Sequence, residues 1–335
     1  MSIRARIFLI IASIAALVIV FSIGTGLFFT QNGLGSAIES DMTVVADIAD
    51  KLITTEINLL KADAAMAARR LNGLRGRDLL EMMEQQIRDY DSFIALAVFD
   101  HDGVAGSAGP APARPRLLNE NYIQNALDGM SVMSSTYDDE SGEFVMYVCV
   151  PMGDRALAVT LSGEFFSDLL KNFTIWKSGY IFMLDDEGVV IAHRDLDWVR
   201  ERVNVIDLAG PGTQYELGAE VDRRMIRGES GSARYLFGGR ELFCVYKPIS
   251  GSKMNWSLGV VVPLSESPIQ NVRGGMLLIG VVCLLLSLAV AAGASLVLEK
   301  PYKKISEMVT ALTKQSERLL VLNEEAVSSA EAKSA

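Results

Sequence analysis

The segment WKSGYIFMLDDEGVVIAHRD, residues 176–195, carries the pattern that decides the fold. An apolar run, YIFML, leads into an acidic turn, DDEG, and a second apolar run, VVIAH, follows. Short apolar runs on both sides of a turn predict a β-hairpin, although Glu187-Gly188 is a weaker turn signal than Asp-Gly. An earlier segment, FIALAVFDHDGVAGS at residues 93–107, repeats this order with Asp102-Gly103 in the turn.

A second pair of matching segments extends the repeat. GEFVMYVCVPMGDRALAVTL, residues 142–161, has the same layout as RELFCVYKPISGSKMNWSLGVVV, residues 240–262. In each, a strand-like run ends at a proline, Pro151 or Pro248, before a hairpin into the last apolar run. The two pairs predict an internal duplication of an α/β module whose sheet is mainly antiparallel.

Helical patterns surround these strands. Residues 35–72 contain no proline and predict one long helix, and a shorter helix is expected at residues 77–90. In the first module we expect helices at residues 119–127 and 163–173, the latter closing the module, and a strand at residues 130–135. The long helix has apolar residues at Ile38, Met42, Val45, Leu52, Leu59 and Met66. The predicted fold class is therefore α+β, with two tandem modules on a long amino-terminal helix.

Two windows, residues 7–29 and 276–298, contain no charged side chain. A helix of this length is about 34 Å long, enough to cross a hydrocarbon core of about 30 Å. We therefore predict two transmembrane helices. The alternative for the first is a cleaved signal peptide, but its apolar stretch is longer than signal peptides have. The alternative for the second is a buried core helix, which rarely runs so far without a charge.

Basic residues flank the two windows on one side of the membrane. They are Arg4 and Arg6 before the first window, and Lys300, Lys303 and Lys304 after the second; Arg273 is a single contrary charge. The positive-inside rule then places both termini in the cytoplasm. The expected order is a cytoplasmic stub (residues 1–6), an extracytoplasmic region (30–273) and a cytoplasmic helix (299–335).

The extracytoplasmic region carries all of the acidity of the chain. Its net charge is −12, against −10 for the whole sequence. A strongly acidic domain argues against binding to nucleic acid and against docking on anionic lipid.

Three cysteines are present. Cys149 and Cys244 lie within apolar strand-like runs of the outer region, and Cys283 lies in the second apolar window. A disulfide between the first two could form in an oxidising compartment, but we expect buried free thiols.

Residues 35–268 resemble the double Cache sensor domain of bacterial receptors. The features that carry the resemblance are the long helix, the tandem sheet modules, the turn FDHDG and the segment 176–195. The resemblance implies two PAS-like modules. The membrane-distal one, about residues 91–173, would hold a small-molecule pocket, and the membrane-proximal one, about residues 177–263, would serve as a relay.

Members of this family that bind amino acids carry an arginine, a tryptophan and a tyrosine before an alanine of the pocket helix, and an aspartate on the final distal strand. An alignment on Ala126 places Ile123 at the tyrosine, Tyr122 at the tryptophan and Glu120 at the arginine, and Thr160 falls at the aspartate. Both charged anchors are therefore missing, and an amino acid would lose the partner of its carboxylate. We predict that common amino acids are not ligands, unless a shifted alignment brings Arg114 or Arg116 into the pocket.

The candidate ligand-binding residues are Tyr122, Tyr137, Thr160 and Glu120, which offer apolar walls, hydroxyl groups and an acceptor. The alternative is that Tyr122 packs in the core, Tyr137 is an exposed turn residue and Glu120 is a solvated helix charge.

The sequence offers no catalytic centre, metal site or cofactor motif. His101 and His193 are isolated from other ligands and are expected at the surface beside turns. The acidic run Asp138, Asp139 and Glu140 lacks the spacing of a calcium loop and is expected to be a solvated hairpin tip.

The cytoplasmic tail has apolar residues at heptad a and d positions: Ile305, Met308, Leu312, Leu319, Leu322 and Ala326, with Gln315 at one d position. This pattern predicts a parallel two-stranded coiled coil and hence a homodimer. The final run, LNEEAVSSAEAKSA, resembles the signalling helix that leads into the phosphoacceptor domain of sensor histidine kinases. No histidine follows His193, so we expect that domain to lie outside this chain.

The expected function is the input half of a two-component sensor histidine kinase, with a small-molecule ligand and a homodimer in the membrane. A response regulator would be a partner only of a protein that includes the kinase domain. The alternatives are the input half of a chemotaxis receptor or a diguanylate cyclase, or a stand-alone membrane binding or adaptor protein.

Overall fold

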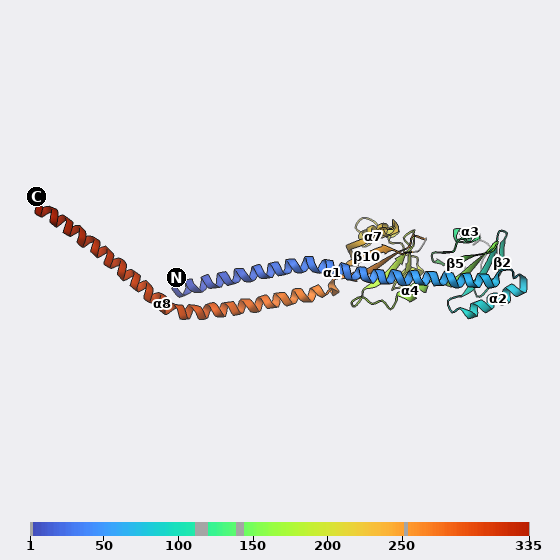
Figure 1. Ribbon diagram of the computed structural model, residues 1–335, viewed down its shortest axis with the longest axis horizontal. Coiled ribbons are helices and arrows are strands. Elements are labelled where there is room, and N and C mark those ends of the chain that lie inside the picture. The colour runs from blue at the N-terminus through green and yellow to red at the C-terminus, as the bar shows by residue number, and fades with distance from the viewer. Residues whose placement is uncertain (1–2, 111–119, 139–143, 251–253, 335) are drawn as a thin grey trace. The chain divides into compact units, whose positions relative to one another are not determined.

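The computed structural model describes residues 3–110, 120–138, 144–250 and 254–334 (Figure 1). It divides into two compact units. Gly35–Ser267 forms the unit that contains both sheets, and the two ends of the chain, Met1–Leu34 and Pro268–Ala335, form the other.

The distal module is built on an antiparallel sheet with the strand order β2-β1-β6-β5-β3, and β4 also pairs with β5. Its strands are β1 (Ala95–Asp100), β2 (Gly103–Ala108), β3 (Val132–Met133), β4 (Tyr137–Asp138), β5 (Phe144–Met152) and β6 (Arg155–Ser162). Helix α3 (Asn121–Leu127) packs on β5 and β6, and α2 (Gly76–Asp89) packs on β1 and β2. Successive residues of β5 and β6 are buried, because helices cover the sheet and strand residues alternate between its faces.

The proximal module repeats this sheet. Its strands are β7 (Tyr180–Leu184), β8 (Val190–Ala192), β9 (Gly231–Phe237), β10 (Arg240–Pro248) and β11 (Ser257–Pro263), in the order β8-β7-β11-β10-β9. Helix α7 (Glu216–Ile226) covers the face that contains Phe182, Leu242 and Val261. Two short helices, α5 (Asp197–Arg200) and α6 (Val205–Leu208), lie between β8 and α7.

The two sheets confirm the internal duplication. Strands β1 and β2 hold the same places as β7 and β8, and β5 and β6 hold the same places as β10 and β11. The register shifts at equivalent positions, between Val98 and Phe99 and between Met183 and Leu184.

In both modules an aspartate at the end of the first hairpin strand accepts hydrogen bonds from amides of the turn. Asp100 Oδ1 accepts hydrogen bonds from the amides of Asp102 and Gly103, both at 3.0 Å. In the proximal module, Asp185 Oδ1 accepts from the amides of Glu187 at 3.1 Å and Val189 at 2.8 Å. A carboxylate that accepts from the next amides stabilises the turn without requiring an ideal Asp-Gly pair.

Helix α1 (Ile3–Leu71) runs past both modules of the sheet unit. Asp50 accepts hydrogen bonds at 2.7 Å from both the amide and the hydroxyl of Ser250 in the proximal module. Just after the helix, the Leu74 carbonyl accepts from Arg155 Nη1 of the distal module at 3.2 Å. The long helix predicted for residues 35–72 is thus confirmed, and it is a support common to both modules.

The buried stripe of α1 differs in part from the apolar positions in the sequence. Small residues with almost no exposure supply much of it, including Ala46, Ala49, Ala64 and Ala67. The large side chains Leu59 and Met66 are 51% and 44% exposed. Alanine allows the helix to approach the sheets closely, and Ile53, Ile57 and Leu60 fill the space between the alanines.

Helix α4 (Phe165–Leu170) does not close the distal module as expected. It packs on β7 and β8 of the proximal sheet. The buried Phe166 ring contacts Trp256 edge to face at 5.8 Å, and the Ser167 hydroxyl accepts a hydrogen bond from the His193 amide at 3.2 Å. The apolar side chains of α4 therefore find their partners in the next module, where a sequence pattern cannot place them.

In the second unit, α1 provides Phe8–Gly26, the one helical segment among the described residues that is long and apolar enough to cross a membrane. Helix α8 (Pro268–Ser334) contains a shorter apolar stretch, Leu278–Ala294. The two helices meet where Ile23 lies over Gly280, and a Cβ on that glycine would stand 2.3 Å from Ile23 Cδ1. The second transmembrane helix stays a prediction.

Cys149 and Cys244 are buried free thiols, as expected. Burial raises the pKa of both, which keeps them protonated and unreactive at neutral pH.

Candidate ligand-binding sites

Three tyrosines form a cluster on the α3 face of the distal sheet. Tyr122 comes from α3, Tyr137 from β4 and Tyr147 from β5. The ring of Tyr122 stacks on that of Tyr147 with centroids 5.6 Å apart, and lies 5.7 Å from that of Tyr137. The structure therefore brings together two of the predicted site residues and adds Tyr147, which the sequence pattern did not single out.

The hydroxyl of Tyr122 lies in the interior and has no hydrogen-bond partner among the described residues. Burial raises the pKa of Tyr122, and nearby Tyr137 and Glu120 raise it further, so the phenol stays protonated. A buried hydroxyl without a partner costs about 1–3 kcal/mol. Such a group is a candidate for a hydrogen bond to a ligand.

The other two predicted residues lie beside this cluster. Glu120 is the residue immediately before α3 and is half-buried. Thr160 is buried on β6, directly opposite Tyr147 in the β5–β6 pairing. Because side chains of directly paired residues lie on the same face of a sheet, Thr160 faces the tyrosine cluster. Tyr137 is half-buried, so it is not an exposed turn residue.

Arg202, from the proximal module, adds a cation that the sequence analysis missed. Its guanidinium carbon lies 5.5 Å from the centre of the Tyr137 ring, in cation–π range. Its Nη1 is buried and has no hydrogen-bond partner among the described residues. Arg202 follows α5, far along the chain from Tyr137, and no local pattern signals this approach.

Some predicted contributors lie outside the described residues. These are Arg114 and Arg116, which a shifted alignment would bring into the pocket, and Asp139 and Glu140 of the acidic run. Asp138 pairs with Phe144 at the end of β4.

The proximal module contains two adjoining cavities on its α7 face. The outer one has a volume of about 370 Å³ and the inner one about 40 Å³. Both are lined by Tyr180, His193, Trp198 and Phe237, so they share a wall.

His193 belongs to this wall, which corrects the prediction that it is a surface histidine. Its ring stacks on Trp198 with centroids 4.9 Å apart and meets Tyr180 edge to face at 4.9 Å. Burial lowers the pKa of His193, so the imidazole is neutral near pH 7. His101, by contrast, is exposed as predicted.

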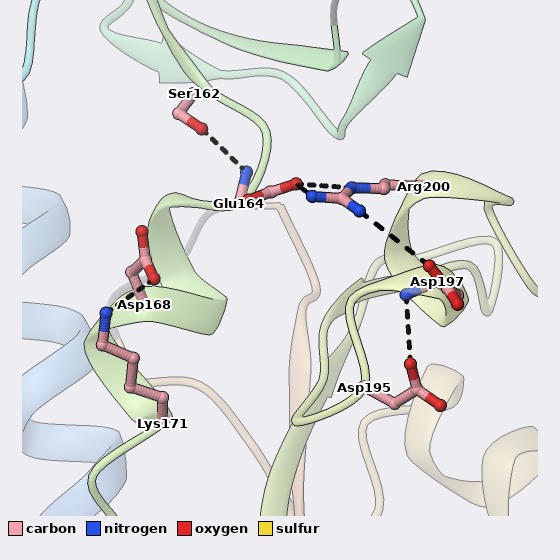
Figure 2. A network of polar contacts seen from close by, with 7 residues as sticks. All are labelled: Ser162, Glu164, Asp168, Lys171, Asp195, Asp197 and Arg200. Atoms are coloured by element: carbon pink, nitrogen blue, oxygen red, sulfur yellow. Dashed lines mark hydrogen bonds and ion pairs between the residues drawn. The ribbon is translucent and has the colours of Figure 1, made fainter.

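Two links between polar side chains of the described residues connect the distal and proximal modules, besides hydrogen bonds from the backbone amides of Met133 and His193. Ser135 Oγ, between β3 and β4, donates to Asp185 Oδ2 at the proximal hairpin turn. Arg200 of α5 forms an ion pair with Glu164, whose amide in turn bonds Ser162 at the end of β6 (Figure 2). Asp185 thus stabilises its own turn through Oδ1 and binds Ser135 of the distal module through Oδ2.

Comparisons with known proteins identify relatives of this fold. A family model described as Cache domain matches residues 30–270. The ligand-binding domain of the amino acid chemoreceptor PctB of Pseudomonas aeruginosa PAO1, in complex with L-Arg, superposes with a TM-score of 0.56 at 15% identity, covering 70% of this chain and 92% of that one.

Two further structures have the same fold. The ligand-binding domain of the chemoreceptor CtaA of Pseudomonas fluorescens, with L-isoleucine, gives a TM-score of 0.56 at 17% identity and covers 71% of this chain and 98% of that one. The extracellular domain of mmHK1S-Z3, described as a histidine kinase, gives 0.53 at 17% identity and covers 69% and 95%. The comparison with curated proteins found no match.

Proposed function

The chain belongs to the Cache domain family, and we propose that it senses a small molecule outside the cytoplasmic membrane and transmits the signal inward. Cache domains are extracellular sensor domains of membrane proteins, and the apolar segment Phe8–Gly26 fits a membrane span. The second span at residues 276–298, and cytoplasmic positions for both termini, complete the proposed topology.

The proposed sensory site is the distal cluster, with Tyr122, Tyr137, Thr160 and Glu120 in contact with the ligand. The main support is the buried Tyr122 hydroxyl without a partner, set between two other rings. A ligand that accepts or donates one hydrogen bond there would relieve the desolvation cost.

Arg202 refines the ligand class. The sequence argument against amino acids depended on two missing anchors, an arginine and an aspartate. Arg202 brings a guanidinium to the edge of the cluster, so an anionic group would find a partner there. The proposal that common amino acids do not bind now depends on Thr160, which cannot pair with an ammonium as an aspartate would.

We propose that the signalling form is a homodimer in which both α1 and the tail take part. The outer face of α1 carries a stripe of exposed apolar side chains, including Val44, Ile48, Leu59 and Met66. At about 100° per residue these positions lie on one face of the helix, and an exposed apolar face favours pairing with a second helix. The tail residues Ile305, Met308 and Leu312 are also largely exposed in the single chain.

The proposed output is that of a two-component sensor histidine kinase, for which this chain is the input half. The resemblance of the terminal run to a signalling helix supports this choice. Chemoreceptors with the same fold support the alternative of a chemotaxis receptor. A cyclase input or an adaptor would use the same sensor, and fusion of the chain to each output domain would distinguish them.

A ligand screen tests the sensory site. The full chain in nanodiscs would be screened by thermal shift against sugars, polyols, organic acids, amines and amino acids, with hits measured by calorimetry. We expect Tyr122→Phe and Thr160→Val to weaken binding of the hit at least tenfold. Tyr90→Phe is the matched control, because Tyr90 stacks on Phe93 outside the cluster. Equal binding to all four proteins would place the ligand elsewhere.

The same calorimetry tests the exclusion of amino acids. We expect no micromolar binding of any common L-amino acid. Micromolar binding that Tyr122→Phe abolishes would contradict the exclusion and place the amino acid in the tyrosine cluster.

A further inference from the structure

The proximal module was expected to act only as a relay, but it contains a cavity with an acidic side chain in its wall. The inner cavity reaches Asp222, whose side chain projects from α7, and extends past Tyr180 and Trp198 to the outer cavity. The strands β7 and β9 and the helix α7 hold this lining in place. The cavity is therefore built by the fold and not by a loop.

Asp222 is a buried acid to which the fold supplies no hydrogen bond among the described residues. The residue is 6% exposed, and its charged neighbour is Arg223. An acid in such a place needs either a proton or a bound cation. Burial raises the pKa of Asp222 to about 7, and the neighbouring Arg223 offsets this only in part.

Aromatic rings surround the remaining sides of the inner cavity. They are Tyr180, Phe182, Trp198, Tyr235 and Phe237. Trp198 and Phe237 lie 5.9 Å apart at an angle of 53°, so two ring faces are inclined toward each other. Ring faces attract organic cations, most strongly where water is excluded.

We infer that the proximal cavity binds a small alkylammonium ion, with its charged nitrogen between the aromatic rings and the Asp222 carboxylate. The rings solvate the alkyl groups and the carboxylate balances the charge. A bare metal ion is disfavoured, because the described residues contain no group of three metal-ligating side chains. The inference is independent of the distal ligand.

The residues around the outer cavity restrict the charge of the part of the ligand that would lie there. Arg194 and Arg240 line it, and both are exposed. Arg194 Nη1 donates to the Ser178 carbonyl at 3.0 Å, so it is fixed at the rim. The exposed Asp195 also lines the entrance, so two arginines and one aspartate leave a net positive charge there, which favours a ligand whose far end is neutral or anionic.

Calorimetry with tetramethylammonium chloride on the full chain in nanodiscs tests the inference. We expect binding in the millimolar range or tighter, no binding of the neutral analogue tert-butanol, and no effect of equal sodium chloride. Asp222→Asn keeps the shape and removes the charge, and is expected to weaken binding at least tenfold.

Two further variants separate binding from folding. Gly218→Ala adds a methyl group to the cavity wall, 3.6 Å from Val205 Cγ1 and 3.8 Å from the rings of Tyr235 and Phe237. These are ordinary contacts, so the variant should fold normally and still bind at least threefold more weakly. Glu220→Gln is the control on the exposed side of α7 and should bind as the native chain does.

The pH dependence provides an independent test. The groups facing Asp222 are Tyr180, Tyr235, Cys244 and His193, all neutral near pH 7, besides the charged Arg223. Binding of tetramethylammonium should therefore strengthen several-fold from pH 6.5 to 8.5, as Asp222 loses its proton. Absence of binding, equal binding to Asp222→Asn, or binding that is flat with pH would each overturn the inference.

Discussion

At the scale of single residues, the molecule contains polar groups that its own fold does not satisfy. Tyr122, Thr136, Arg155 and Arg202 each bury an atom without a hydrogen-bond partner among the described residues. Asp222 is a carboxyl group that is 6% exposed and has a charged neighbour, Arg223, but no hydrogen bond among those residues. Most buried polar groups in proteins are paired. Tyr122 belongs to the distal module, Arg202 reaches the same tyrosine cluster from the proximal module, and Asp222 lies in the proximal cavity. These three groups are at the two places proposed for ligands, whereas Thr136 and Arg155 belong to neither proposed site.

Asp222 makes the stability of the native chain depend on pH. Its pKa is about 7 in the folded state, against 3.8 for an ordinary aspartate. The folded protein therefore binds an extra proton between about pH 4 and pH 7, and stability falls as pH rises through this range. Over this range the free energy of unfolding should fall by a few kcal/mol in the native chain, and Asp222→Asn should remove that fall. Urea unfolding of both proteins at pH 5 and pH 8 measures it; parallel curves would mean that Asp222 is hydrated.

At the scale of elements, α1 has two faces with different tasks. Ala49, Ala67, Ile53 and Ile57 pack against the modules, while Leu59 on the other face is exposed. A helix needs only one apolar face to join a core. The second face is the surface that the proposed dimer would bury.

Cysteine crosslinking tests this face of α1. In a Cys283→Ser background, which removes the exposed native thiol, Leu59→Cys should form a disulfide dimer in membranes within minutes of oxidation. Asn58→Cys is the matched control, since it is exposed but turned about 100° around the helix. Gel electrophoresis without reductant gives the readout. Equal rates at both positions would argue against a specific α1 pair.

At the scale of the whole sensory unit, two modules of one topology are joined by few polar contacts. The side-chain links are Ser135–Asp185 and Glu164–Arg200, and the amides of Met133 and His193 add bonds to Met254 and Ser167. Helix α4 also inserts Phe166 into the proximal core. The Glu164–Arg200 pair is partly exposed and contributes at most about 1 kcal/mol. The Ser135–Asp185 bond is part-buried, so it is the better candidate for coupling.

Ser135→Ala should uncouple the modules without unfolding either. The Asp185 turn keeps its bonds to the amides of Glu187 and Val189, so the proximal hairpin remains intact. We expect a loss of stability of about 1 kcal/mol. The ligand found in the distal screen should still bind, but it should no longer change crosslinking between Ile305→Cys tails. An undiminished ligand effect in Ser135→Ala would assign the coupling to α4 or α1.

Much of the fold follows from local chemistry. The apolar runs around Asp102-Gly103 and Glu187-Gly188 predicted the hairpins, their repetition predicted two equivalent sheets, and proline-free periodicity predicted the long helix. These features are local, because strand alternation, turn preference and helix period are properties of neighbouring residues. Strand β9 and helix α7 were missed: both are amphipathic elements whose charged outer faces, with Arg234 and Glu220, obscure the apolar pattern.

The amino-acid sequence by itself thus determined the membership of the family, the two modules and the buried cysteines, and it named Tyr122 and Tyr137 as candidates for one site. Only the tertiary structure decided which atoms remain unsatisfied. Arg202 reaches Tyr137 across the module boundary, α4 joins the neighbouring sheet, and Asp222 meets rings from three other elements. A desolvated charge is defined by what surrounds it in space, and those neighbours are distant in sequence.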